Sequence, residues 1–407
     1  MRRILTLYQN SYRGLNPASW WLSAVMLINR SGTMVVPFMT LYLTQKLHYS
    51  ISQAGLVFGI FGAGAICGGL IGGRLADLFG FYPVQVVALG LGGILFMILG
   101  HMHTYPLICL FTFLLALIND SFRPANAMAI AQYSSIENRT RSYSLNRLAI
   151  NLGWASGGSL GGFIAAHNYN LLFIIDGWTN IGAAILLLLF LPPAKGQRIH
   201  RRKLSGVIRF EAYRDIRYLW FIVLVILYAL VFFQLFSTLP VYFRQVLHLS
   251  EPVIGGTMAG NGIIIALFEM VLVFRLEGRN SPLQYIPIGS LICAISFMIY
   301  NLFPAGILVA AISTILVTVG EMLSMPFMNT YWTSRTQERN RGQYAGLYTV
   351  AWSLAQVLGP ISGARFADKL GFTALWWLIG GIGTLVSFGF WLLHRDEKAL
   401  AISARTE

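Results

Sequence analysis

The sequence is poor in charge and in cysteine. Only 11% of its 407 residues are Asp, Glu, Lys or Arg, far below the roughly 25% of a soluble globular domain. Its three cysteines, Cys67, Cys109 and Cys293, all fall in apolar stretches, which excludes a disulfide framework. The seven histidines lack metal-ligand spacing, and no phosphate-binding loop of the GxxxxGK pattern is present. We therefore expect no metal, no cofactor and no ATP chemistry in this chain.

Apolar sequence dominates instead. Hydrophobic residues make up 56% of the chain, and the mean hydropathy is +0.65. Several runs approach the ~20 residues that cross a hydrocarbon core, and many of the 41 glycines lie within them, as in helices that pack closely in lipid. We predict an all-α integral membrane protein with about 12 transmembrane helices, near residues 18–43, 52–73, 83–101, 106–131, 143–167, 171–192, 218–242, 252–274, 284–301, 305–330, 342–366 and 374–394.

The distribution of positive charge predicts the orientation. With a cytoplasmic N-terminus, 22 of the 29 Lys and Arg residues fall in the tails and the cytoplasmic loops. The opposite side holds only Lys46, Arg244 and Lys369. This is the positive-inside bias, so we expect a multi-pass protein of the cell's inner (plasma) membrane with both termini cytoplasmic. No basic groove remains for nucleic acid.

One long basic gap divides the predicted spans into two sets of six. We predict an N-terminal six-helix bundle at 1–192, a basic cytoplasmic linker at 193–217 and a C-terminal six-helix bundle at 218–407. The two halves align with each other at an offset of 202 residues, or 200 near the start of each half, which indicates a duplication and two pseudo-symmetric bundles. The matching pairs include Pro124 and Pro326, Asn138 and Asn340, Arg139 and Arg341, and His48 and His248.

A short loop after the second span carries the most specific motif. Gly73, Asp77 and Gly80 match the signature that the major facilitator superfamily has in this loop, which the chain also resembles in its span number, central loop and duplicated halves. Phe81 and Tyr82 replace the family's usual basic pair. The carboxylate can cap a neighbouring helix N-terminus, so we expect a latch between conformational states. The resemblance implies alternating access of a central site between two bundles.

The fifth span carries glycines at intervals of four. Gly153, Gly157 and Gly161 line one helical face, so this helix can pack backbone to backbone against a neighbour. The pattern resembles the glycine-rich motif of the family's antiporters, although Gly158 stands where that motif has proline. Generic helix packing explains the same glycines.

Ionisable residues inside the spans cost roughly 2.5–3.5 kcal/mol each on insertion scales, so their presence indicates pairing or function. Asp120 and Arg123 can neutralise each other at a spacing of three residues. Arg30 is expected to meet Asp120 or an anionic group of the substrate. Glu321 and Glu269 have no basic partner in their own spans. Two further charges, Asp176 and Arg147, are expected to reach the membrane interface.

These residues give a division of roles. The substrate-binding candidates are Arg30, Asn119, Arg123, Tyr228 and Tyr331, the last two as aromatic walls. The proton-coupling candidates are Glu321, Glu269 and Asp120, because a carboxyl group in low dielectric can exchange protons near neutral pH.

We therefore predict a proton-coupled secondary transporter, not an enzyme, that exports drug-like or metabolite molecules and acts as a monomer. Its partners would be a small-molecule substrate, protons and the lipid bilayer. Uptake of short peptides or other zwitterions is the alternative, although the first span lacks the charged ExxER stretch of peptide transporters. A transport-inactive membrane sensor is a second alternative. An enzyme acting on lipids would need a cluster of nucleophile and base at the membrane edge, and the sequence has none.

Overall fold

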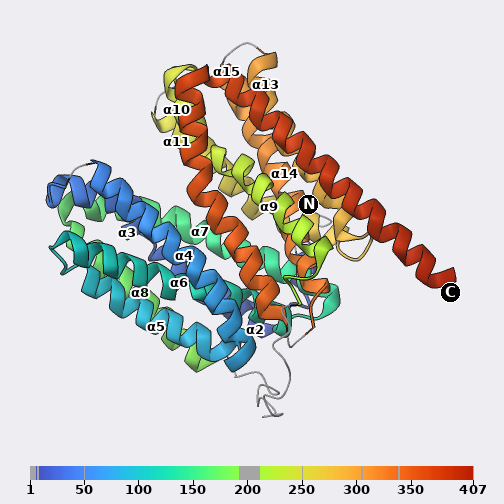
Figure 1. The fold of residues 1–407 in the computed structure, drawn as a ribbon, viewed down its shortest axis with the longest axis horizontal. Helices are drawn as coiled ribbons and strands as arrows, with labels where there is room; N and C mark the ends of the chain where they lie inside the picture. Colours follow the sequence, from blue (N-terminus) through green and yellow to red (C-terminus); the bar gives the residue numbers. More distant parts are fainter. Residues whose placement is uncertain are drawn as a thin grey trace. The chain divides into compact units, whose positions relative to one another are not determined.

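The computed structural model describes residue 6 and residues 9–49, 51–191, 211–249, 251–303, 306–337 and 340–406. Every regular element in these ranges is helical (Figure 1). The elements of the first half are α2 (Pro17–Ser31), α3 (Val35–Leu41), the π-helix η1 (Tyr42–Lys46), α4 (Ile51–Phe79), α5 (Phe81–Leu99), α6 (Tyr105–Tyr133), the 3-10 helix η2 (Ile136–Asn138), α7 (Arg139–His167) and α8 (Tyr169–Phe190).

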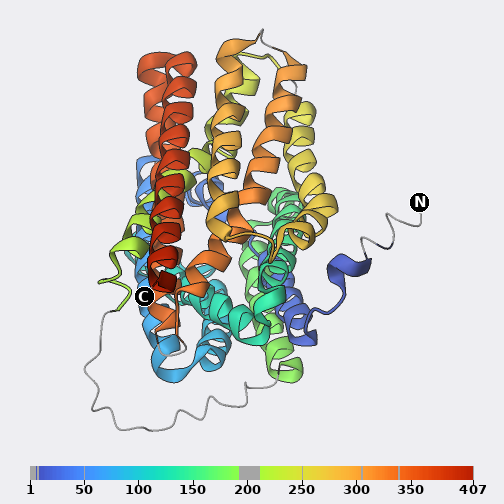
Figure 2. The same cartoon turned by 90° about the vertical axis from the view of Figure 1, so that its right-hand side faces the viewer.

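The second half continues in the same style. Its elements are α9 (Ile216–Phe232), the 3-10 helix η3 (Phe233–Leu235), α10 (Thr238–Gln245), α11 (Glu251–Ile264), the π-helix η4 (Ile265–Glu269), α12 (Met270–Leu276), α13 (Pro282–Leu302), α14 (Ile307–Ser334) and α15 (Arg341–Thr406). Helices α13 and α14 pack side by side (Figure 2). Gly289 and Gly320 allow this, because a Cβ at Gly320 would lie 2.7 Å from the Gly289 carbonyl oxygen.

The chain forms two compact units. Unit 1 contains 1–13, 213–335 and 354–407, and unit 2 contains 14–212 and 336–353. The first turns of α15 therefore belong to unit 2 although they come late in the sequence. Most of the predicted linker at 193–217 lies outside the described residues, which resume at Glu211.

Nine helices in the described ranges are long and apolar enough to cross a membrane. The last of the nine lies within α15 and covers two predicted spans, 342–366 and 374–394. Gly371, with φ 81°, breaks α15 between these two spans. The predicted first and fifth spans correspond to α2 with α3 and to α7, which are not among the nine. The first is broken between α2 and α3, and the fifth carries several polar residues and the spaced glycines.

The break in the first span depends on a buried carboxylate. Asp176 on α8 accepts hydrogen bonds from the backbone N–H groups of Met34 at 2.9 Å and Val35 at 2.7 Å, at the start of α3. Its side chain is fully buried. The expectation that Asp176 reaches the membrane interface is therefore wrong: the unpaired N–H groups of a helix start need an acceptor, and Asp176 supplies it.

The two halves repeat unusual local structures. His48 and His248, 200 residues apart, both have positive φ, at 56° and 52°, which is uncommon for residues other than glycine. Asn138 accepts a hydrogen bond from the Ser135 backbone N–H, and Asn340 accepts the matching bond from Gln337. Each half therefore builds its turns in the same way, as a duplicated sequence should.

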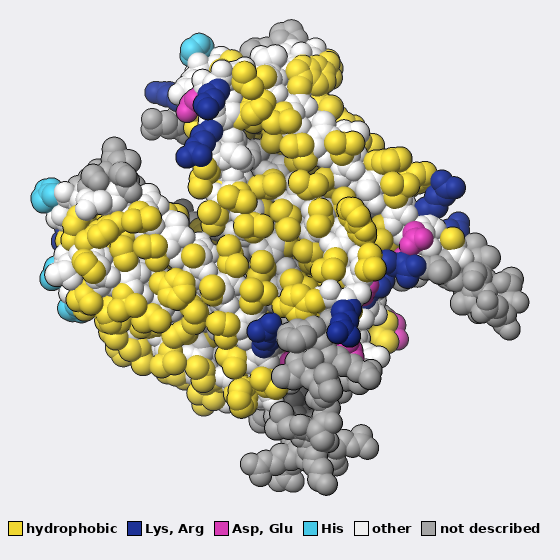
Figure 3. All heavy atoms as spheres, in the orientation of Figure 1, with side chains coloured by type: hydrophobic (Ala, Val, Ile, Leu, Met, Phe, Trp, Pro, Cys, Tyr) yellow, Lys and Arg dark blue, Asp and Glu magenta, His cyan; other side chains and the backbone are white. Residues whose placement is uncertain are grey.

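Hydrophobic side chains cover most of the face drawn in Figure 3. Many hydrophobic side chains of the described residues are largely exposed, among them Leu189 at 71%, Leu308 at 70% and Leu385 at 70%. A water-soluble surface does not carry apolar area on this scale, so lipid is the expected surroundings of these helices.

Candidate functional site

The motif after the second span lies against the start of α15. Asp77, near the end of α4, accepts hydrogen bonds from the backbone N–H groups of Gly342 at 2.6 Å and Gln343 at 2.9 Å. A side chain at position 73 would prevent this contact. Its Cβ would lie 3.0 Å from the Cα of Gly346 and even closer to the carbonyl oxygen of Gly342, so Gly73 is needed here. A carboxylate at this position satisfies unpaired N–H groups and favours the positive end of the helix dipole.

Gly80 supplies the turn that follows. It precedes α5 with φ 88°, a conformation that a side chain rarely adopts. The turn lets α5 start directly after α4 ends at Phe79.

The spaced glycines of α7 face α2 and α3. A Cβ at Gly153 would lie 2.5 Å from the Cβ of Arg30, and one at Gly157 would lie 2.9 Å from the Ser31 carbonyl oxygen. Gly161 lies against Met34 in the same way. These glycines therefore bring the backbone of α7 close to the backbone that carries Arg30.

Unit 2 holds a charged centre, which we call the arginine centre: Arg30, Asp120, Arg123 and Ser353. Arg123 donates from Nη1 to Asp120 Oδ1 at 3.2 Å and to Ser353 Oγ at 3.2 Å. Arg30 on α2 interacts electrostatically with both Arg123 and Asp120, but it forms no ion pair with the described part of the chain. The centre therefore carries two cations and one anion.

Two residues on α6 shape this region. Pro124 follows Arg123, and a proline inside a helix removes the hydrogen bond to the carbonyl four residues earlier, here that of Asp120. The side chain of Asn119 lies against α5, with Oδ1 3.4 Å from the Cβ position of Gly92. The structure thus brings Arg30, Asp120 and Arg123 together and places Asn119 on another side of α6.

Unit 1 holds a different polar centre, which we call the acid centre: Glu321, Asn261, Thr318 and Tyr228. Asn261 on α11 donates from Nδ2 to Glu321 Oε1 and, at 2.9 Å, to Thr318 Oγ1. Glu321 and Thr318 lie on α14, one turn apart, and Glu321 is only 2% exposed. The sequence alone does not point to Asn261, because this residue lies 60 positions before Glu321 and no local pattern links the two.

Tyr228 on α9 extends the acid centre. Its hydroxyl lies 3.6 Å from Cys293 Sγ and interacts with Ser324 and with Glu321. The structure therefore brings the predicted substrate contact Tyr228 and the predicted proton carrier Glu321 into one cluster, all of it inside unit 1.

The other predicted acid of unit 1 occupies an unusual backbone. Glu269 ends the π-helix η4 and is 2% exposed. Single π-turns inside helices are frequent at functional sites. Glu269 therefore stays a candidate for proton coupling.

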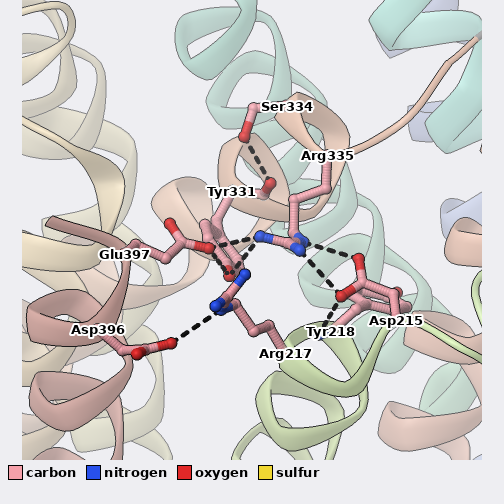
Figure 4. Close-up of polar contacts among 8 residues, drawn as sticks. All are labelled: Asp215, Arg217, Tyr218, Tyr331, Ser334, Arg335, Asp396 and Glu397. Atoms are coloured by element: carbon pink, nitrogen blue, oxygen red, sulfur yellow. Dashed lines mark hydrogen bonds and ion pairs between the residues drawn. The ribbon is translucent and has the colours of Figure 1, made fainter. Parts of the chain in front are cut away.

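Tyr331 lies in an ion-pair cluster at the end of α14 (Figure 4). Its hydroxyl donates to Glu397 Oε1 at 2.7 Å, and Arg335 binds Glu397 as well. Arg335 also forms two hydrogen bonds with Asp215, at 2.9 and 3.0 Å. The nearby carboxylates and Tyr331 raise the pKa of Arg335 against the opposing effect of burial, so this residue stays charged. The structure therefore gives Tyr331 one polar partner on α15, Glu397, and one at the end of α14, Arg335.

Comparison with known proteins identifies the family. The model of the Major Facilitator Superfamily matches residues 21–360 and 286–407, which cover most of the chain. The chain belongs to the major facilitator superfamily. It is therefore a multi-pass membrane transporter for small molecules, and not an enzyme, as the sequence predicted.

Several curated proteins of the superfamily resemble this chain at low identity. The quinolone resistance protein NorA of Staphylococcus aureus is 26% identical over 343 residues, covering 82% of this chain and 85% of NorA. The multidrug resistance protein MdtH of Sodalis glossinidius is 22% identical and covers 90% of each chain. The uncharacterized MFS-type transporter YqjV of Bacillus subtilis is 25% identical and covers 88% of each.

Solved structures confirm the predicted fold class. The human organic anion transporter MFSD10 (TETRAN) superposes with a TM-score of 0.77 at 14% identity, covering 92% of this chain and 98% of that one. The proton:xylose symporter XylE superposes with a TM-score of 0.71 at 17% identity, covering 92% and 94%. At these identities the likeness establishes the major facilitator fold alone.

Proposed function

We propose that this transporter exports drug-like or metabolite molecules by alternating access, in exchange for protons. Two of the similar proteins are named for quinolone and multidrug resistance, which favours export. The positive-inside pattern supports cytoplasmic termini, and Asp77 with Gly73 and Gly80 would act as the latch that holds one state. We also propose that the transporter acts as a monomer.

The acid centre carries the proposal of proton coupling. Glu321 is buried in a spanning helix, and its carboxyl is held by the Asn261 amide. A carboxyl group in low dielectric that accepts from an amide can take up or release a proton near neutral pH. The arginine centre, with two cations and one anion, would bind the substrate.

Proteoliposomes with an imposed pH gradient test this proposal. We expect gradient-driven movement of norfloxacin or ethidium by the wild type, with matching proton flux reported by a pH-sensitive dye inside the vesicles. Glu321→Gln should abolish the response to the gradient while exchange of labelled for unlabelled solute continues. A response of Glu321→Gln equal to that of the wild type would contradict the assignment.

Glu137→Gln is the matched control. Glu137 lies fully exposed before α7, and the Ser135 hydroxyl lowers its pKa, so it remains ionised at neutral pH. Its removal should leave coupling unchanged.

The same vesicles separate the alternatives. Accumulation of a dipeptide such as alanylalanine with the proton gradient, and none of the drugs, would favour proton-coupled uptake of zwitterions. Failure of every solute to move, with cellular signalling that survives loss of Glu321 and Arg30, would favour a sensor.

A further inference from the structure

A cavity of about 780 Å³ opens on the side of unit 1. It lies between the start of α9 and the last part of α15. Its apolar wall includes Trp220, Leu224 and Leu392, of which Trp220 is 62% exposed. A Cβ at Gly389 would lie within 2.5 Å of Leu224, so the two helices meet closely beside the cavity. A groove on an apolar outer face of this kind would be filled by lipid.

The polar end of the groove is the end that the charge pattern assigns to the cytoplasm. Four charged residues line it: Arg214, Asp215, Arg217 and Asp396. Both acids already have partners, since Asp215 binds Arg335 through two hydrogen bonds and Asp396 binds Arg217 at 2.8 Å (Figure 4).

The arginines keep unused donors. Within the described ranges Arg217 forms an ion pair only with Asp396, through Nε, and its side chain is 41% exposed. Arg214 forms no ion pair with any part of the chain that the structure describes. The groove therefore offers guanidinium N–H groups at its mouth, directly above an apolar channel.

We propose that this groove is a binding site for an anionic phospholipid of the surrounding membrane. The lipid phosphate binds Arg214 and Arg217, because a guanidinium group matches phosphate in geometry and charge. One acyl chain lies along Leu224 and Leu392, and Trp220 sits at the headgroup level, where tryptophan is enriched. Basic pockets on the cytoplasmic side of spanning helices recognise anionic headgroups for the same reason.

The headgroup should be anionic rather than zwitterionic. Phosphatidylcholine brings its own quaternary ammonium group, which would meet the cationic Arg214 beside the phosphate. Phosphatidylglycerol carries the phosphate without that charge. The site therefore selects for phosphatidylglycerol over phosphatidylcholine, and the selectivity weakens with salt, since exposed charges are screened.

Lipid binding to the purified full chain tests the proposal. Native mass spectrometry after incubation with equal amounts of phosphatidylglycerol and phosphatidylcholine should show preferential retention of phosphatidylglycerol by the wild type. The double variant Arg214→Gln, Arg217→Gln should bind it about 25-fold more weakly, at about 1 kcal/mol for each cation near the membrane surface. The matched double variant Arg275→Gln, Arg279→Gln removes two cations from the same predicted side and should bind normally. Leu392→Trp, which narrows the channel without changing charge, should weaken both lipids alike.

Four results would overturn the proposal. The first is equal retention of both lipids by the wild type, which can be measured even if the double variant fails to fold. The second is unchanged phosphatidylglycerol binding by the double variant. The third is competition by glycerol 3-phosphate at the same concentration, which would make the site one for a soluble anion. The fourth is a dimer that forms through this face and dissociates in the Trp220→Ala variant, because the groove would then be occupied by a second copy of the chain.

Discussion

The arginine centre of unit 2 and the acid centre of unit 1 stand on matching helices of a duplicated sequence, yet their chemistry differs. At the offset of 202 residues, Asn119 on α6 occupies the position of Glu321 on α14. On α6 the carboxyl group has moved one residue along, to Asp120, where it meets Arg123. On α14 the carboxyl group meets the Asn261 amide instead.

This difference shows how two matching helices can place an acid in two different chemical surroundings. An arginine places a full positive charge beside a carboxyl group, whereas an amide offers it a neutral hydrogen-bond donor. The duplicated helices supply the same positions, and under the proposed mechanism the neighbour of each acid, Arg123 or Asn261, sets the role of that acid.

The largest expected effect comes from replacing Glu321 on α14 by asparagine, the residue at the matching position of α6. Glu321→Asn should reduce gradient-driven transport at least about tenfold, because the proton carrier is gone. Asp120→Asn should keep the response to the gradient and lower affinity for the substrate. Initial rates of transport at a series of imposed pH gradients measure both variants. If Asp120→Asn removes coupling to the pH gradient as fully as Glu321→Asn does, the proposed difference in role between the arginine centre and the acid centre is wrong.

The next effect concerns the unpaired cation of the arginine centre. Arg30→Gln should raise the KM for norfloxacin, which carries a carboxylate, about tenfold, since a hydrogen bond to a charged group contributes roughly 1.5–3 kcal/mol. The KM for the cation ethidium should stay the same or fall. Arg30→Lys restores the charge without the planar donor geometry and should give an intermediate value. Equal changes in KM for both solutes would show that Arg30 acts through packing alone.

A smaller effect is expected at the amide that holds Glu321. Asn261→Leu removes a donor that favours the charged carboxylate, so the midpoint of transport against pH should move upward by about one pH unit, equivalent to about 1.4 kcal/mol. Thr318→Val removes the contact that orients Asn261, together with the hydroxyl's hydrogen bond to the Thr314 carbonyl, and should move the midpoint in the same direction by less. The pH dependence of initial rates in proteoliposomes gives both shifts, and a downward shift would be incompatible with the proposed role.

The smallest effect is local stability at the start of α15. Asp77→Ala removes the acceptor for two backbone N–H groups and should cost about 1 kcal/mol, the usual loss for a missing helix cap. Asp77→Asn should cost less, because an amide oxygen can still accept. Hydrogen exchange at 341–345 in the purified protein measures the loss. Protection that is the same in Asp77→Ala and the wild type would mean that the carboxylate does not hold this helix start.

The sequence correctly predicted the features that depend on residues close together in the chain. Length and hydropathy marked the spans, and spacing alone put Asp120 and Arg123 in reach of each other, where the structure places them 3.2 Å apart. The family signature pointed to Asp77. The fold class and the transporter family followed from such patterns together.

Contacts between distant segments were out of reach. Asp176 looked like a residue at the membrane interface, but it caps α3 from 142 residues away, because Gly32 ends α2 early and leaves the start of α3 without acceptors. Tyr331 finds its partner Glu397 across 66 residues. Such contacts are set by how the helices pack in three dimensions, and no pattern in the sequence indicates them.

The twin turns at His48 and His248 offer a practical tool. Both histidines are exposed and have a similar positive φ, so a pair of spectroscopic labels placed at these two sites would mark the same turn in each half of the duplication. A change in the separation of the labels during a transport cycle would then report motion of one half relative to the other.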